Sequence, residues 1–191
     1  MMSVQRKHLW SAVAASLLIL GSQLAAAQDS NSKVEKARKD IDSDVAAILK
    51  DFRAMKGAES MFDKAAGYAV FKVTKAGLGA SGAGGGGVAV DKKTGARTYM
   101  RMGSAGVGLT IGVSRYDIVI LFETPERFAS FVKGGWDSAA TAQAAAGSKG
   151  AEISSSFFNG VAYYQIGKKG LMASADVSGT KFWVTEDLNE K

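Results

Sequence analysis

The chain has 191 residues, 47% of them hydrophobic and 22% charged, and it carries a formal net charge of +6. This composition excludes a disordered chain, which would be poorer in aromatic and branched residues, and the length suits one domain behind a short targeting segment. There is no cysteine, so packing rather than disulfides must stabilise the fold. A dense basic run is also missing, and nucleic acid is therefore not expected as a partner.

The first 27 residues have the three parts of a secretory signal peptide. A positive start, an apolar run and a stretch of small residues follow one another: Arg6-Lys7-His8, Leu9–Leu20 and Gly21–Ala27. The apolar run is shorter than the roughly 20 residues that span a bilayer, which disfavours an uncleaved anchor. We therefore expect cleavage near Ala27, before Gln28, and a periplasmic or secreted protein whose residues 28–191 form a single domain.

Residues 33–56 have the periodicity of an amphipathic helix. Apolar residues recur mostly at spacings of three and four, and charges of both signs fill the other face. Gly57 suits the end of this helix, and a short second helix is expected over residues 59–66. The apolar face could lie in a bilayer interface or pack on the domain's own sheet. Packing is favoured, because interfacial helices prefer Lys and Arg on the polar face.

Strand patterns follow from residue 67 onward and are interrupted by one helix. A glycine-rich segment at residues 76–87 precedes a hairpin whose turn is Asp91–Gly95. Thr124-Pro125-Glu126 opens a helix with a cap and a proline in its first turn. Residues 136–158 should form a loop or a short helix. The expected strands cover residues 68–74, 88–90, 96–102, 105–113, 116–123, 161–166, 171–177 and 181–185.

The order of these elements indicates an α+β fold. We expect an N-terminal amphipathic helix packed on a mostly antiparallel, glycine-rich sheet or partial barrel, with an inserted helix and a sheet core over residues 67–185. In residues 105–113, branched side chains share one face, and small residues leave the other side nearly bare. A crowded contact between sheets explains that bare side better than the approach of an acyl chain.

The residues available for catalysis are few. His8 is the only histidine and lies in the expected signal peptide, and there is no cysteine. A Ser-His-Asp triad, a cysteine nucleophile, a histidine-based zinc site and haem ligation by histidine are thereby excluded. Gly77–Gly82 matches a dinucleotide-binding glycine pattern, but no helix follows to hold a pyrophosphate. We expect no enzyme, no metal and no cofactor.

Basic residues beside glycine-rich turns are candidates for lipid binding. Lys72 and Lys75 lie three positions apart at the first strand, and Lys168 and Lys169 lie in the turn between Gly167 and Gly170. Each such charge adds about 1 kcal/mol near an anionic surface, although an ordinary solvated loop also explains any one of them. Loss of residues 1–27 removes two basic residues and no acid, which leaves a net charge of +4. That excess is compatible with an anionic lipid surface.

Five motifs in order give the chain a family resemblance. They are Gly67-Tyr-Ala-Val-Phe-Lys-Val-Thr-Lys-Ala-Gly-Leu-Gly79, Gly84-Gly-Gly-Gly-Val-Ala-Val90, Gly106-Val-Gly-Leu-Thr-Ile-Gly112, Asp117-Ile-Val-Ile-Leu-Phe122 and Lys169-Gly-Leu-Met-Ala-Ser-Ala-Asp-Val-Ser-Gly179. With them the chain resembles the SYLF domain family of lipid-binding proteins, over roughly residues 33–185. The resemblance implies a non-enzymatic module. It also implies membrane contact through the N-terminal helix, with Lys33, Lys36, Arg38 and Lys39, and through Lys72 and Lys75.

The resemblance also bears on the ligand. Eukaryotic members of the family bind phosphoinositides, and some engage actin. An exported bacterial protein meets neither as a normal partner, so actin is not expected and anionic phospholipid is the general expectation.

Three functions compete at this point. The first is a periplasmic lipid-binding or membrane-surface-binding module. The second is a structural or protein-interaction module of the cell envelope. The third is an enzyme that uses carboxylates or the serines of Ser154–Ser156. It ranks last, because a serine without a base is not activated.

Overall fold

The computed structural model describes residues 31–137, 140, 153, 156–168, 170–172 and 179–190, without the side chains of residues 78–80 and 106–111. These belong to two compact units, residues 1–39 and residues 40–191. In the first unit, residues 31–39 are helical, and Lys39 pairs with Glu35 at 2.8 Å, one helical turn away. All further elements lie in the second unit, where residues 40–53 are helical.

The centre of the second unit is one long β-hairpin. β1 (Gly67–Asp91) pairs antiparallel with β2 (Arg97–Phe122), from Gly67 opposite Phe122 to Val90 opposite Arg97. The expected turn closes the hairpin. The Asp91 carboxylate accepts hydrogen bonds from the backbone N–H groups of Lys93 and Thr94, and Gly95 adopts a φ of 73°. The prediction of separate short strands at 68–74, 88–90, 96–102, 105–113 and 116–123 is wrong. Backbone pairing continues through the glycine-rich segment, interrupted only by a register shift between residues 78 and 80.

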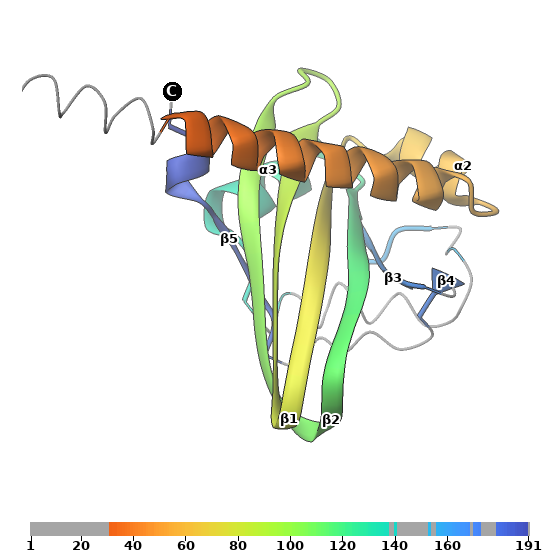
Figure 1. Cartoon of the computed structure of the whole chain (residues 1–191). Helices are drawn as coiled ribbons and strands as arrows, with labels where there is room; N and C mark the ends of the chain where they lie inside the picture. Colours follow the sequence, from red (N-terminus) through yellow and green to blue (C-terminus); the bar gives the residue numbers. More distant parts are fainter. Residues whose placement is uncertain are drawn as a thin grey trace, which may run out of the picture. The chain divides into compact units, whose positions relative to one another are not determined.

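The hairpin is folded back on itself. In Figure 1 both strands run away from the helix, bend at their far end and return. The returning half of β1 then lies against the first half, and the backbone N–H of Lys92 donates to the Ala66 carbonyl at 3.1 Å. A Cβ at Gly85 would overlap the Lys72 carbonyl oxygen, and one at Gly87 the Val70 carbonyl oxygen. Only glycine allows this approach of backbone to backbone.

The remaining strands extend the sheet from β2. They are β3 (Val161–Gly167), β4 (Gly170–Leu171) and β5 (Lys181–Val184), followed by a short 3-10 helix, η1 (Glu186–Leu188). Among the described residues the sheet has five antiparallel strands in the order β1-β2-β3-β4, with β5 on β2, and it is not closed. The predicted α+β class is confirmed. Most of residues 136–158 and of the strand expected at 171–177 lie outside the described residues.

The inner face of the sheet holds an aromatic core. α3 (Pro125–Gly134) begins as predicted, with the Thr124 hydroxyl accepting from the backbone N–H of Arg127 and proline in the first turn. It buries Phe128 and Phe131 against Phe122 of β2 and Phe182 of β5. The bend of the hairpin thus encloses a core of rings and branched side chains.

The outer face of the sheet is covered in part by helix 40–53. This helix, orange in Figure 1, crosses the strands and buries Val45, Ile48 and Phe52. The Phe52 ring lies 5.2 Å from that of Tyr164 on β3. Packing on the sheet, rather than on a bilayer, is therefore the role of this part of the helix. It ends at residue 53 instead of the predicted 56, and a turn over residues 54–57, with Gly57 at a φ of 89°, leads into α2 (Ala58–Lys64).

Ion pairs hold the same helix on the sheet. Asp42 accepts from Arg97 at 2.6 Å and from the Tyr99 hydroxyl at 3.0 Å. Asp44 accepts from the Lys72 ammonium at 2.6 Å. Because these carboxylates lie on helix residues that face β1 and β2, they add polar contacts to the apolar packing of the helix on the hairpin.

The Asp42 contacts make a modest, measurable contribution to stability. Asp42→Ala should lower the free energy of unfolding by about 1 kcal/mol, since a half-exposed ion pair and one hydrogen bond are lost. Asp40→Ala is the matched control, because Asp40 is exposed on the same helix. Urea denaturation of both variants checks this, and equal losses of stability would contradict it.

Candidate functional site

The four basic residues predicted on the N-terminal helix all lie in the first unit. Lys33, Lys36 and Lys39 are exposed there, and Arg38 is partly buried. The hydrogen bond and charge of Glu35 raise the pKa of Lys39 above its usual value. Together the four are the basic residues of the helical segment 31–39.

The lysines predicted on the first strand have different surroundings. Lys72 is half-exposed and its ammonium is paired with Asp44, so it secures the helix as well as facing solvent. Lys75 is partly buried and lies opposite Ser114, one position from Val113, whose exposed fraction is 68%. Lys168 is exposed at the end of β3, and Lys169 lies outside the described residues.

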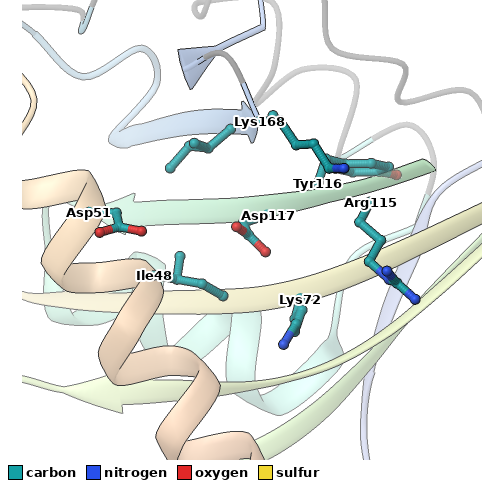
Figure 2. Close-up of a pocket in the computed structure, with 9 residues that line it drawn as sticks. Ile48, Asp51, Lys72, Arg115, Tyr116, Asp117 and Lys168 are labelled. Atoms are coloured by element: carbon teal, nitrogen blue, oxygen red, sulfur yellow. The ribbon is translucent and has the colours of Figure 1, made fainter.

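Lys72 and Lys168 meet at one cleft on the outer face. The cleft has a volume of about 280 Å³ and lies between helix 40–53, β2 and the end of β3 (Figure 2). The pairing of the strands explains which residues form the floor of the cleft. Lys72 on β1, Asp117 on β2 and Ile166 on β3 lie opposite one another on three adjacent strands. The lining residues are Ile48, Asp51, Lys72, Arg115, Tyr116, Asp117, Ile166, Gly167 and Lys168.

Three charged residues of this cleft were missed in the sequence. Arg115 and Asp117 are two positions apart on β2 and therefore lie on the same face of the strand. Asp51 follows Ile48 by three residues on the helix. A signal existed for Asp117, because it is the one charged residue within the otherwise apolar segment 116–122. Its combination with Lys168, 51 positions along the chain, depends on the pairing of β2 with β3.

Burial dominates the titration of Asp117. It raises the pKa of this carboxyl above its ordinary value, against the opposing effect of Lys72, and the nearby charges of Asp44 and Asp51 raise the pKa further. The carboxylate form of Asp117 is therefore less stable in the folded chain than in the unfolded chain.

This shift predicts a pH-dependent gain from Asp117→Asn. The folded state binds the Asp117 proton more tightly than the unfolded state, so stability falls as pH rises from about 4 through the folded pKa. The Asn variant should therefore be more stable than the parent at pH 7, and the difference should vanish below about pH 4, where Asp117 is protonated in both states. Urea midpoints at both pH values check this. A variant that is less stable at pH 7 would contradict it.

A second surface lies on the same outer face and was also missed. Trp183 of β5 stands opposite Arg101 of β2, and Lys181 stands opposite Gly103. The Trp183 ring covers Gly103, where a Cβ would lie 3.0 Å from the ring atom Cη2. Arg101, Lys181 and Trp183 are exposed, Trp183 to 45%. We call these three residues the basic–aromatic patch.

The patch has a basic character because of the strand composition. The outward positions of β1 and β2 beside it are mostly glycine, and Gly84 lies opposite Gly103. Within the described part of these strands, no carboxylate occupies an outward position of residues 82–90, 97–105 or 181–183.

Among the described helices, none is long and apolar enough to cross a membrane.

The fold and these surfaces define an α+β domain built on a folded glycine-rich hairpin with basic residues on its outer face. Residues 103–191 match the family model Ysc84, described as "Las17-binding protein actin regulator". The chain is also 44% identical over 144 residues to Beta cell expansion factor A of Aeromonas veronii, an alignment that covers 75% of this chain and 55% of that protein.

The chain belongs to the Ysc84 (SYLF) family, as the five motifs indicated. The family is associated with lipid or actin-related binding. The family model covers most of β2 and everything after it, including Arg115, Asp117, Lys168 and two residues of the basic–aromatic patch, Lys181 and Trp183. Arg101, the third residue of the patch, lies just before the matched range. The chain spans about half the length of the curated relative it matches.

Proposed function

We propose that the protein is a non-enzymatic, membrane-surface-binding module of the periplasm that takes anionic phospholipid. The single observation that carries this proposal is the basic–aromatic patch. A half-exposed tryptophan between two cations matches the residues that proteins place at the membrane–water interface. The lipid association of the family supports the ligand class, and the signal-peptide pattern of residues 1–27 supports export.

The physical basis is a combination of charge and shape. Arg101 and Lys181 each contribute about 1 kcal/mol near an anionic bilayer surface. Gly84 and Gly103 carry no side chain beside Trp183. The indole ring covers Gly103 on one side, and because Trp183 is half-exposed, its other side can contact the headgroup region. Farther along the hairpin, the partly buried Lys75 and the exposed Val113 supply a further cation and an apolar group.

Vesicle sedimentation tests the proposal. The exported protein should bind phosphatidylglycerol-containing vesicles at low salt and bind phosphatidylcholine vesicles much more weakly. Arg101→Glu/Lys181→Glu should weaken binding at least about 30-fold, because two favourable charges are lost and two unfavourable ones are added. The control is Lys93→Glu/Lys133→Glu, which makes the same charge change at exposed lysines of the hairpin turn and of α3.

Two results would contradict the proposal. One is an absence of binding by the parent protein at low salt, which would favour the protein-interaction alternative. The other is an equal loss in the two double variants. The location is tested separately by mass spectrometry of the periplasmic fraction, where a chain beginning at Gln28 is expected.

A further inference from the structure

The cleft on the outer face contains charges of both signs, and most of them form no ion pair. Lys72 is paired with Asp44. Among the residues that the structure describes, Asp51, Asp117, Arg115 and Lys168 have no ion-pair partner, although all four line one cleft of about 280 Å³. Asp117 is in addition half-buried, so water compensates its charge only in part.

The two signs are separated within the cleft. Figure 2 shows Asp51 and Asp117 on either side of Ile48, with Arg115 beyond Asp117 on the side away from Asp51. Lys168 joins from the end of β3, near Tyr116 (Figure 2). A simple anion in this cleft would approach two carboxylates, and a simple cation would approach Arg115 and Lys168. Only a ligand with both signs gives each group an opposite charge.

We infer that the cleft binds a zwitterionic phosphate ester, in which a short carbon chain joins a phosphate to a primary ammonium group. The phosphate lies toward Arg115 and Lys168, because guanidinium and ammonium groups bind phosphate oxygens. The ligand's ammonium lies between Asp51 and Asp117. The side chains of Ile48 and Ile166 contact the linking carbons.

This chemistry is shared by an ethanolamine phospholipid headgroup and by the free water-soluble ester. As a headgroup it rests on the proposed function, since the membrane would then present the ligand to the cleft. The basic–aromatic patch and the cleft use different residues of the same outer face, so the two can be tested apart. The soluble ester tests the cleft without any membrane.

The deciding experiment is an NMR titration of the exported protein with glycerophosphoethanolamine. Saturable shifts are expected at the backbone amides of Ile48, Ile166 and Gly167, with an affinity in the millimolar range. Glycerol 3-phosphate lacks the ammonium, and glycerophosphocholine has a methylated one that cannot donate hydrogen bonds. Each should bind at least about tenfold more weakly.

A variant pair separates the cleft from general charge effects. Asp51→Asn/Asp117→Asn should weaken binding of glycerophosphoethanolamine about tenfold, since both partners of the ammonium lose their charge. Asp63→Asn/Asp187→Asn removes the same charge at exposed positions of α2 and η1 and should bind like the parent. Equal binding of glycerol 3-phosphate, or an equal loss in both pairs, would overturn the inference.

Vesicles identify the source of the ligand. With phosphatidylglycerol held constant, added phosphatidylethanolamine should strengthen binding of the parent and not of Asp51→Asn/Asp117→Asn if the ligand is a headgroup. Binding of the soluble ester without this gain assigns the cleft to the free ester. Vesicle binding through the basic–aromatic patch with no response to the soluble ester overturns the inference and leaves the proposed function standing. A response to the soluble ester without any vesicle binding supports the inference and contradicts only the proposed function.

Discussion

Gly87→Ala is expected to destabilise the protein by about 3 kcal/mol or more, although it adds only one methyl group. The new Cβ would overlap the Val70 carbonyl oxygen and lie 2.5 Å from the Phe71 ring atom Cδ1. The carbonyl belongs to the backbone of the first half of β1 and cannot rotate away as a side chain would. The two halves of the hairpin would have to separate, which exposes the core between them.

Gly84→Ala is the matched control, three residues away on the same strand. A Cβ there would lie 3.9 Å from the nearest atom, the Met102 carbonyl oxygen, which is an ordinary contact. This variant should keep the parent's stability within about 0.5 kcal/mol. Urea denaturation followed by circular dichroism compares the two. Similar midpoints for both variants would refute the close contact between the halves of β1.

Phe131→Ala is expected to cost about 3 to 5 kcal/mol, as is usual for a buried ring removed from a core. Phe131 is fully buried, and its ring lies 5.0 Å from Phe122, 4.8 Å from Trp136 and 5.7 Å from Phe182. It thereby joins α3 to both β2 and β5. A domain with a typical stability of 5 to 15 kcal/mol would lose a large share of it.

The readout for Phe131 includes a local signal. Loss of the ring should weaken the near-ultraviolet circular dichroism of Trp136, which packs against it. Phe131→Leu should lose less stability, because it keeps most of the apolar volume. Ser130→Ala, at an exposed position of the same helix, should change stability by less than about 0.5 kcal/mol. If Phe131→Ala resembled Ser130→Ala, the ring would not join the helix to the sheet.

Both variants concern residues that hold the outer face in shape. Gly87 brings the two halves of β1 together, and Phe131 supports β5, which carries Trp183 and Lys181 of the basic–aromatic patch. A destabilised variant could therefore lose vesicle binding indirectly. The charge reversals at Arg101 and Lys181 avoid this effect, because both side chains are exposed.

Local signals in the sequence determined the parts of the fold that depend on neighbouring residues. Thr124 and Pro125 predicted the start of α3, Asp91–Gly95 predicted the hairpin turn, and the spacing of apolar residues predicted the N-terminal helix. Each depends on contacts within about one turn of chain, such as an N-cap hydrogen bond. The ordered motifs likewise identified the family.

Only the tertiary structure decided how the long hairpin bends and which side chains it brings together. The glycines of residues 76–87 suggested a break in the strand, yet backbone hydrogen bonds need no side chain and the pairing continued through them. The cleft unites Asp51, Lys72, Asp117 and Lys168 from four elements, and the patch unites Arg101 with Trp183 across 82 positions of chain. Such proximity depends on the register of distant strands, which composition and periodicity do not contain.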